Sequence, residues 1–288
     1  MNVAFVGLGT MGAPMARRLQ EARHDVSGWD VTEAGRARFS ACSGSLADAL
    51  AGAEAIVTML PEGRHVAEVY RTGVFGHAAP GTLLMDCSTI DVETTRELAA
   101  QAGERGYMML DAPVSGGAEG AGQGQLSFMV GGLAEGLARA TPLLEAMGSK
   151  VTHFGDTGTG QAAKACHNMI CGITALGVCE AFALADALGL EADKFFSLCK
   201  GAAAQSWILE NRCPVPGPAP NAPSSNEYAP GFAARLMAKD LRLAQAAAGA
   251  SGQSTPFGSQ AAERFTEFAE TGGGDFDFSA IYDTIRTK

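Results

Sequence analysis

The sequence predicts an α/β fold, in which a doubly wound, mainly parallel β-sheet is followed by an all-helical domain. Short apolar runs alternate with amphipathic segments in the first half of the chain, which is typical of βαβ units. A glycine-rich turn follows the first apolar run and opens a helical pattern. From about Thr159 onward no convincing strand pattern remains, and the sequence becomes helical.

The expected strands are short apolar runs bounded by turn residues: Asn2–Val6, Asp25–Asp30, Ala55–Leu60, Thr82–Asp86, Tyr107–Ala112, Leu126–Val130 and Val151–Phe154. Most are separated by helix-like stretches, of which Met11–Ala22, Val92–Gly103 and Gly136–Met147 are the clearest. Because parallel strands need crossover connections of this kind, we expect a mainly parallel sheet.

The second half predicts helices only. An Ala-rich apolar stretch without proline runs from Thr159 to Leu188 and predicts one long helix. Further helices are expected at Ala192–Lys200, Phe232–Ala250 and Gln260–Glu270. We therefore expect a first domain over residues 1–160 and a second over 161–288, joined by the long helix.

A proline-rich segment interrupts the helical half. Six of the 12 prolines lie between Pro214 and Pro230, and proline fixes φ and removes a backbone donor. The segment is either a surface loop or linker, or a wall of a functional site.

Composition excludes several classes of protein. The 288 residues include 21 Lys and Arg against 31 Asp and Glu, a net charge of −10, which disfavours binding to nucleic acid or an anionic membrane. Seven cysteines without a Cys-x-x-Cys pair indicate reduced thiols. No unbroken apolar run approaches the roughly 18 residues of a membrane span. The first strand leaves no room for a signal peptide, so we expect a cytoplasmic protein.

The glycine-rich turn matches the dinucleotide-binding fingerprint. It consists of Gly7, Leu8, Gly9, Thr10, Met11 and Gly12. The first glycine permits a tight turn, the second lets a pyrophosphate approach the backbone, and the third allows close packing of helix and strand. The alternative is a purely structural glycine turn.

Asp30 ends the second expected strand, where an acidic residue accepts hydrogen bonds from the adenosine ribose. A carboxylate there repels a 2′-phosphate, and no arginine follows directly. NAD is therefore favoured over NADP, although Asp30 could also be an ordinary turn residue.

Other polar groups follow strands. Leu60, Pro61, Ser88 and Thr89 come at strand ends, where ligands of open parallel sheets bind, although each alone fits an ordinary turn. The segment Asp111–Gly117 leaves a strand for a glycine-rich loop. Its serine, Ser115, and the amides of Gly116 and Gly117 could hold a carboxylate, or could simply form a turn.

Lys164 and Asn168 are spaced to share one face of the long helix. A lysine among apolar neighbours either extends into solvent or handles a proton. The five histidines show no metal-ligand spacing, and no nucleophile-elbow motif is present, which leaves metal-free hydride chemistry.

Four segments together resemble the signature segments of the β-hydroxyacid dehydrogenase family. They are Gly7–Ala16, Asp111–Ala121, Gly155–Asn168 and Lys239–Leu241, in family order from end to end of the chain. Within the family the chain is most similar to the 3-hydroxyisobutyrate dehydrogenase branch, because of Ser88–Asp91, Pro214–Gly217 and the segment from Pro223 through Leu241.

The resemblance implies a role for each matching residue. Lys164 corresponds to the catalytic lysine, and the substrate-binding residues would be Ser115, Gly116, Gly117 and Asn168. Cofactor contacts beyond the fingerprint and Asp30 would come from Leu60, Pro61, His65, Thr89, Phe232 and Lys239. Of these, Thr89 and Phe232 would lie beside the nicotinamide. His65 stands where many relatives carry an asparagine, and Arg18 replaces another family asparagine.

The resemblance also implies a reaction, NAD-dependent oxidation of 3-hydroxyisobutyrate to methylmalonate semialdehyde in valine breakdown, by a homodimer or homotetramer whose second domain serves substrate binding and assembly. Rival members reduce tartronate semialdehyde, glyoxylate or succinic semialdehyde. Imine reductases usually lack the lysine. A non-catalytic dinucleotide-binding protein is the alternative from another class.

Overall fold

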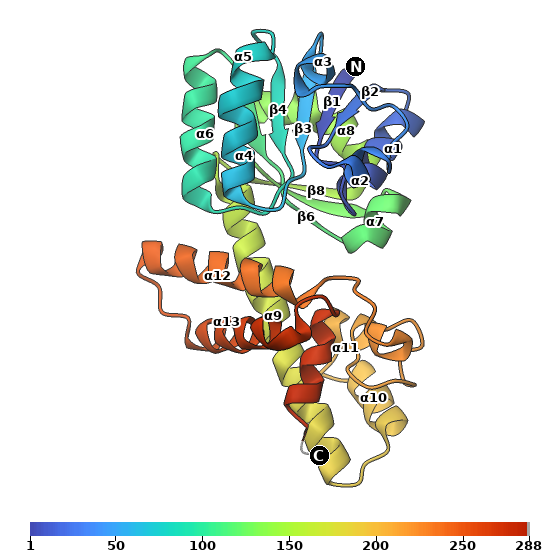
Figure 1. The fold of residues 1–288 in the computed structure, drawn as a ribbon. Coiled ribbons are helices and arrows are strands. Elements are labelled where there is room, and N and C mark those ends of the chain that lie inside the picture. The colour runs from blue at the N-terminus through green and yellow to red at the C-terminus, as the bar shows by residue number, and fades with distance from the viewer. Residues whose placement is uncertain (287–288) are drawn as a thin grey trace. The chain divides into compact units, whose positions relative to one another are not determined.

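The computed structural model describes residues 1–286, which divide into two compact units. The first comprises Met1–Lys164 and the second starts at Ala165 (Figure 1). Helix α9 (Thr159–Ala187) begins in the first unit and continues in the second. The division falls a few residues after the boundary expected at residue 160.

The first unit contains one eight-stranded sheet. Its strands are β1 (Asn2–Val6), β2 (Asp25–Trp29), β3 (Ala55–Thr58), β4 (Leu83–Asp86), β5 (Met108–Asp111), β6 (Val114–Ser115), β7 (Leu126–Gly131) and β8 (Gly148–Gly155). The order is β2-β1-β3-β4-β5-β7-β6, and β8 pairs with β7. The first five strands in this order are parallel, as expected for a doubly wound sheet of Rossmann type. Strand β7 runs antiparallel to both β5 and β6.

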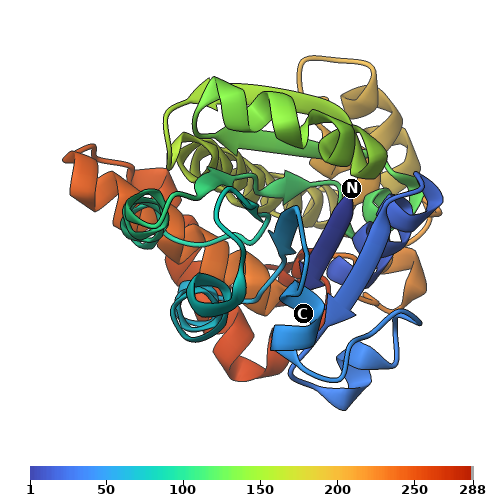
Figure 2. The same cartoon turned by 90° about the horizontal axis from the view of Figure 1, so that it is seen from above.

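Helices cover both faces of this sheet (Figure 2). They are α1 (Gly12–Glu21), α2 (Glu33–Arg36), α3 (Leu46–Leu50), α4 (Gly63–Val69), the π-helical turn η1 (Tyr70–Val74), α5 (Phe75–His77), α6 (Val92–Glu104), α7 (Gly117–Gln123) and α8 (Ala134–Met147). Alternate residues of β1 face opposite sides, since Val3 and Phe5 pack with α1 and α8, whereas Ala4 and Val6 pack with α4 and α6. Two apolar layers therefore sandwich the sheet.

The second unit is helical. After α9 it contains α10 (Ala192–Lys200), α11 (Trp207–Asn211), the 3-10 turn η2 (Pro223–Asn226), α12 (Ala234–Ser251), α13 (Pro256–Phe268), the π-helical turn η3 (Ala269–Gly273) and the 3-10 turn η4 (Phe278–Thr284). Its own core gathers apolar side chains from α9, α10, α12 and α13. Among residues 165–286, strand-like pairing is confined to one bridge, between Ala233 and Asp277.

The proline-rich segment packs onto the core of the second unit. Ser224 is buried, and its hydroxyl donates to the carbonyls of Cys213 (2.7 Å) and Val215 (3.0 Å). The Tyr228 hydroxyl donates to the Pro214 carbonyl at 2.7 Å. These bonds fasten both ends of the segment, which does not fit a loose linker.

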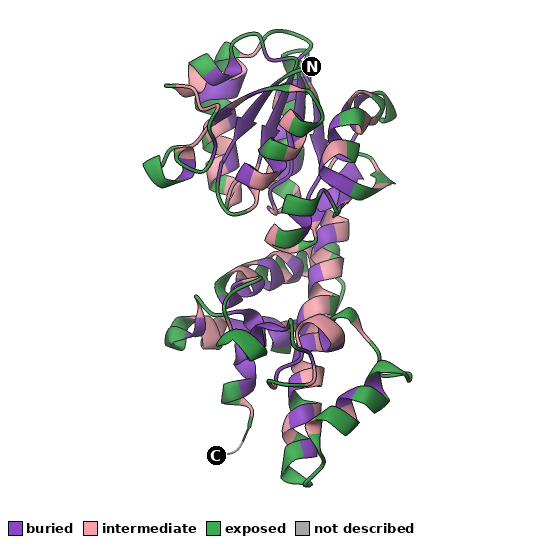
Figure 3. Ribbon diagram, turned by 90° about the vertical axis from the view of Figure 1, so that its right-hand side faces the viewer, coloured by how far each residue is buried: buried purple, intermediate pink, exposed green. Residues whose placement is uncertain are grey.

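Helix α9 is strongly apolar but incompletely covered (Figure 3). Over one 18-residue window its mean hydropathy is 1.6, and 33% of that window is buried. By length and composition alone, α9 could cross a membrane, although no unbroken apolar run had suggested it. The core helix of a soluble protein can have the same length and composition.

Candidate functional site

The predicted cofactor residues follow the carboxyl ends of the parallel strands. Val6 of β1 lies opposite Trp29 of β2 and Thr58 of β3, and Asp86 of β4 lies opposite Thr58. The segments after these residues therefore leave the same edge of the sheet. This edge is where open α/β sheets bind ligands.

The glycine turn has room for a ligand at one glycine only. Gly7 has φ +97°, and a Cβ there would lie 2.3 Å from the Met59 carbonyl oxygen. A Cβ on Gly12 would lie 1.8 Å from the Gly7 carbonyl oxygen. Gly9 has no such neighbour within 4 Å, so its backbone faces open space. This arrangement fits a pyrophosphate that approaches Gly9 at the start of α1.

Asp30 is held beside this turn. Its Oδ2 accepts a 2.7 Å hydrogen bond from the backbone N–H of Leu8, whose side chain is buried in the core. Its Oδ1 accepts from the backbone N–H and the hydroxyl of Thr32, both at 2.7 Å. A carboxylate has about four acceptor sites, so Asp30 keeps capacity for a ribose hydroxyl.

Arg36 reaches the same corner, which the sequence reading missed because no arginine directly follows Asp30. Helix α2 folds back, and Arg36 Nη1 donates to the carbonyl of Asp30 at 2.7 Å and to that of Val31 at 3.2 Å. The guanidinium therefore braces the backbone of the predicted ribose site.

The segments after β3 and β4 are bonded to each other. The Ser88 hydroxyl accepts a 2.8 Å hydrogen bond from the backbone N–H of Leu60. Thr89 is half-buried, and Pro61 is exposed. His65 lies on α4 with its Nδ1 buried, and that atom has no hydrogen-bond partner within residues 1–286. A buried ring nitrogen of this kind is suited to a bound polar group.

The first turn of α9 is anchored by Asp111. This carboxylate is fully buried at the end of β5, and it accepts from the backbone N–H groups of Gly158 (2.8 Å) and Gln161 (2.9 Å). Burial raises the pKa of Asp111, and these bonds partly offset the increase. Asp111, expected only as the first residue of the predicted anion-binding loop, thus binds a helix N-terminus with its carboxylate.

Lys164 lies one turn beyond this anchor. It is 7% exposed, which does not fit a side chain that extends into solvent. Its neighbour on the same face, Asn168, is also buried. The proton-handling interpretation of Lys164 is therefore the one that its burial favours.

Ser115 ends the two-residue strand β6, and α7 starts two residues later. Gly116 has φ +134° and Gly117 has φ +64°, conformations that favour glycine. Ser115 is half-buried and Gly116 is exposed. A hydroxyl and consecutive backbone amides thus follow one another on a partly open turn, as a carboxylate site would require.

A polar chain surrounds Asn168 in the second unit. Its Nδ2 donates to Oδ2 of buried Asp240, and its Oδ1 is 2.8 Å from Nδ1 of His167. Lys239 Nζ lies 3.2 Å from Oδ1 of Asp240. Because the carboxylate oxygen accepts this bond, Asp240 fixes which side of the amide carries its N–H groups. Sequence reasoning noticed Asp240 only as part of a family segment.

Phe232 precedes α12, and Asp277 holds its backbone. Asp277 Oδ2 accepts from the N–H groups of Gly231 (3.1 Å) and Phe232 (3.0 Å). The Phe232 ring packs edge-on against Phe278, with centroids 6.1 Å apart. Phe232 is therefore fixed in place while remaining partly exposed.

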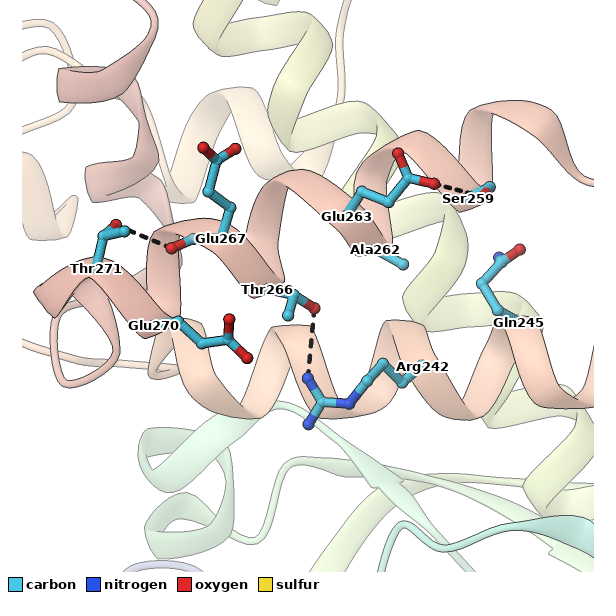
Figure 4. A pocket seen from close by; sticks show the side chains of 9 residues that line it. All are labelled: Arg242, Gln245, Ser259, Ala262, Glu263, Thr266, Glu267, Glu270 and Thr271. Atoms are coloured by element: carbon cyan, nitrogen blue, oxygen red, sulfur yellow. Dashed lines mark hydrogen bonds between the residues drawn. The ribbon is translucent and has the colours of Figure 1, made fainter.

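A separate groove lies between α12 and α13 (Figure 4). Its volume is about 620 Å³, and it is lined by Arg242, Gln245, Ser259, Ala262, Glu263, Thr266, Glu267, Glu270 and Thr271. Arg242 Nη1 donates a 3.4 Å hydrogen bond to the Thr266 hydroxyl across the groove, drawn as a dashed line in Figure 4. It contains none of the predicted site residues.

The chain matches two family models. The NAD binding domain of 6-phosphogluconate dehydrogenase matches residues 2–155. The model described as NAD-binding of NADP-dependent 3-hydroxyisobutyrate dehydrogenase matches residues 158–285. Together they span both units.

Relatives align over the full chain. A 3-hydroxyisobutyrate dehydrogenase of Pseudomonas aeruginosa is 44% identical over 100% of this chain and 99% of its own length. An NAD-dependent L-serine dehydrogenase of the same organism is 45% identical over 97% of this chain and 96% of its own length. The structure of a Mycobacterium tuberculosis 3-hydroxyisobutyrate dehydrogenase with L-serine is 44% identical, with a TM-score of 0.93 and 99% coverage of both chains.

These matches, the Rossmann-type sheet and the glycine turn agree on one assignment. The chain belongs to the β-hydroxyacid dehydrogenase family and is an NAD-dependent oxidoreductase of its 3-hydroxyisobutyrate dehydrogenase branch.

Proposed function

We propose that this enzyme oxidises 3-hydroxyisobutyrate to methylmalonate semialdehyde, as a step of valine breakdown in the cytoplasm. The observation that carries the proposal is the burial of Lys164 on a helix whose first turn is fixed by Asp111. Bound NAD would supply the acceptor for the hydride of the alcohol carbon. Lys164 is the general acid and base of the reaction.

Lys164 acts on the hydroxyl proton. In oxidation its neutral Nζ takes that proton as the carbon–hydrogen bond breaks, and the alcohol becomes an aldehyde. In reduction its ammonium group returns the proton to the carbonyl oxygen. A positioned acid–base group of this kind contributes about 10²- to 10⁴-fold to the rate.

The substrate carboxylate must be bound by hydrogen-bond donors. We assign this role to the Ser115 hydroxyl, the backbone N–H groups of Gly116 and Gly117, and the amide of Asn168. The bond from Asn168 to Asp240 supports this assignment, because it fixes the orientation of the amide. Thr89, His65, Phe232 and Lys239 are assigned to the cofactor.

L-Serine is a second candidate substrate, because one relative is an L-serine dehydrogenase and one solved relative contains L-serine. Both compounds carry a primary hydroxyl on the carbon next to C2. They differ at C2, where 3-hydroxyisobutyrate has a methyl group and L-serine has an ammonium group. The same lysine chemistry serves both.

Initial rates of NADH formation at 340 nm decide between them. We expect kcat/KM for 3-hydroxyisobutyrate to exceed that for L-serine, with 3-hydroxypropionate, which has neither substituent, as the reference. A higher value for L-serine would reassign the substrate. Turnover of neither, together with reduction of tartronate semialdehyde, glyoxylate or succinic semialdehyde, would reject the proposal.

We also propose that the enzyme is a homodimer or homotetramer. The second unit exposes large apolar side chains, among them Ile170, Leu184, Leu188, Leu198 and Trp207. Exposed apolar surface of this kind is typical of association sites. Light scattering after size-exclusion chromatography measures the assembly, and a monomer at micromolar concentration would refute this part.

A further inference from the structure

One buried side chain bonds both neighbours of Thr89. Gln161 is 1% exposed, and its Nε2 donates to the carbonyl of Ser88 at 2.8 Å. Its Oε1 accepts from the backbone N–H of Ile90 at 3.2 Å. The two bonds hold the backbone on either side of Thr89, and they connect residues more than 70 positions apart.

The same residue belongs to the anchored turn of α9. Its backbone N–H donates to Asp111 at 2.9 Å, and Lys164 follows three residues later. All of these residues lie in the first unit. Gln161 therefore joins the segment that carries Thr89 to the helix that carries Lys164.

We propose that Gln161 is a positioning residue, which keeps Thr89 and Lys164 at the separation that hydride and proton transfer require. The inference rests on the proposed roles of those two residues. An amide suits the task, because it donates to one carbonyl and accepts from one N–H at the same time. Ionised glutamate would lose the donor, and methionine would lose both bonds. A misplacement of about 1 Å between reacting groups can lower a rate by about 10²-fold.

The test uses Gln161→Met, which keeps the length and bulk of the side chain, and Gln161→Glu, which keeps only the acceptor. Thr159→Ala is the matched control, because Thr159 starts the same helix but its hydroxyl donates to Asp156 at 2.7 Å. We expect Gln161→Met to lower kcat about 10- to 100-fold, with the Kd of NADH within threefold of wild type. The kcat of Gln161→Glu should fall at least tenfold. The control should stay within threefold of wild type.

Hydrogen exchange provides a readout that needs neither substrate nor turnover. In Gln161→Met the peptide that contains Ile90 should exchange at least tenfold faster, while peptides from β1 and α8 keep their wild-type rates. The control should leave the Ile90 peptide unchanged. This result would locate the effect in the bonded segment.

Two results would overturn the inference. One is a kcat of Gln161→Met within threefold of the Thr159→Ala control, together with unchanged exchange at Ile90. The other is a parallel rise in exchange throughout the first unit with loss of NADH binding, which would assign Gln161 a purely structural role. Activity is measured with whichever hydroxy acid the wild type oxidises best, so a wrong substrate assignment leaves this test intact.

Discussion

Asp86 makes the stability of the first unit depend on pH. This carboxyl is fully buried at the end of β4, where its Oδ1 accepts from the Thr58 hydroxyl at 2.7 Å and from the Ser88 N–H at 3.2 Å. Burial raises the pKa of Asp86 from 3.8 to about 6, although the bonds from Ser88 and Thr58 oppose the increase. Within residues 1–286, its Oδ2 has no hydrogen-bond partner.

The sign follows from proton binding. The folded state holds the Asp86 proton more tightly than the unfolded chain does, so this group favours folding at low pH, and the contribution is lost as pH rises through about 6. A pKa of about 6 in the folded state against 3.8 for the free group corresponds to about 3 kcal/mol in total. Between pH 5 and pH 8 the loss should be on the order of 1 kcal/mol.

Urea unfolding at several pH values measures this loss. The Trp207→Phe substitution removes the tryptophan of the second unit. The fluorescence of Trp29, at the end of β2, then reports on the first unit alone. We expect Asp86→Asn to abolish the extra loss of unfolding free energy between pH 5 and pH 8. Asp25→Asn, an exposed carboxyl in the same unit, should leave it in place. Parallel pH profiles of the wild type and Asp86→Asn would refute the reasoning.

Three further predictions concern binding. Asp30→Ala should weaken NADH binding about 10- to 100-fold, through loss of charge-assisted hydrogen bonds, and should weaken NADPH binding much less. Fluorescence titration measures both affinities, and equal losses for the two cofactors would contradict this prediction. Gly9→Ala should fold normally but bind NADH at least about tenfold more weakly, and normal NADH binding would place the pyrophosphate elsewhere. Gly12→Ala should instead lower the unfolding temperature, because its Cβ meets the backbone. Asp240→Ala should raise the KM for the hydroxy acid about 5- to 100-fold by releasing the Asn168 amide, and a wild-type KM would show that this bond has no role in substrate binding.

Local patterns predicted most of the fold. The expected helix Ala192–Lys200 and strand Asn2–Val6 match the structure residue for residue, because their periodicity and flanking signals are local. Strand β6 was missed because two residues carry no period, and it is paired only through β7. Strand direction was not predicted either, because the alternation of strands and helices in the sequence does not show that β7 runs antiparallel to β5.

The site was predictable only in part. The glycine turn and Asp30 are recognisable from a short motif with a fixed spacing, and the structure brings them together through Leu8. Asp111, Gln161 and Asp240 act through partners about 50 to 70 residues away, so no local spacing marks them. All three residues lie in the segments that resemble the family signatures, but the resemblance implied no role for them.

The proton-transfer role of Lys164 is tested most directly by the rate of hydride transfer in Lys164→Ala, measured in single turnovers with and without added methylamine. The account predicts a rate about 10²- to 10⁴-fold below wild type, an unchanged Kd for NADH, and partial recovery that rises with amine concentration. A rate within tenfold of wild type without amine would contradict it.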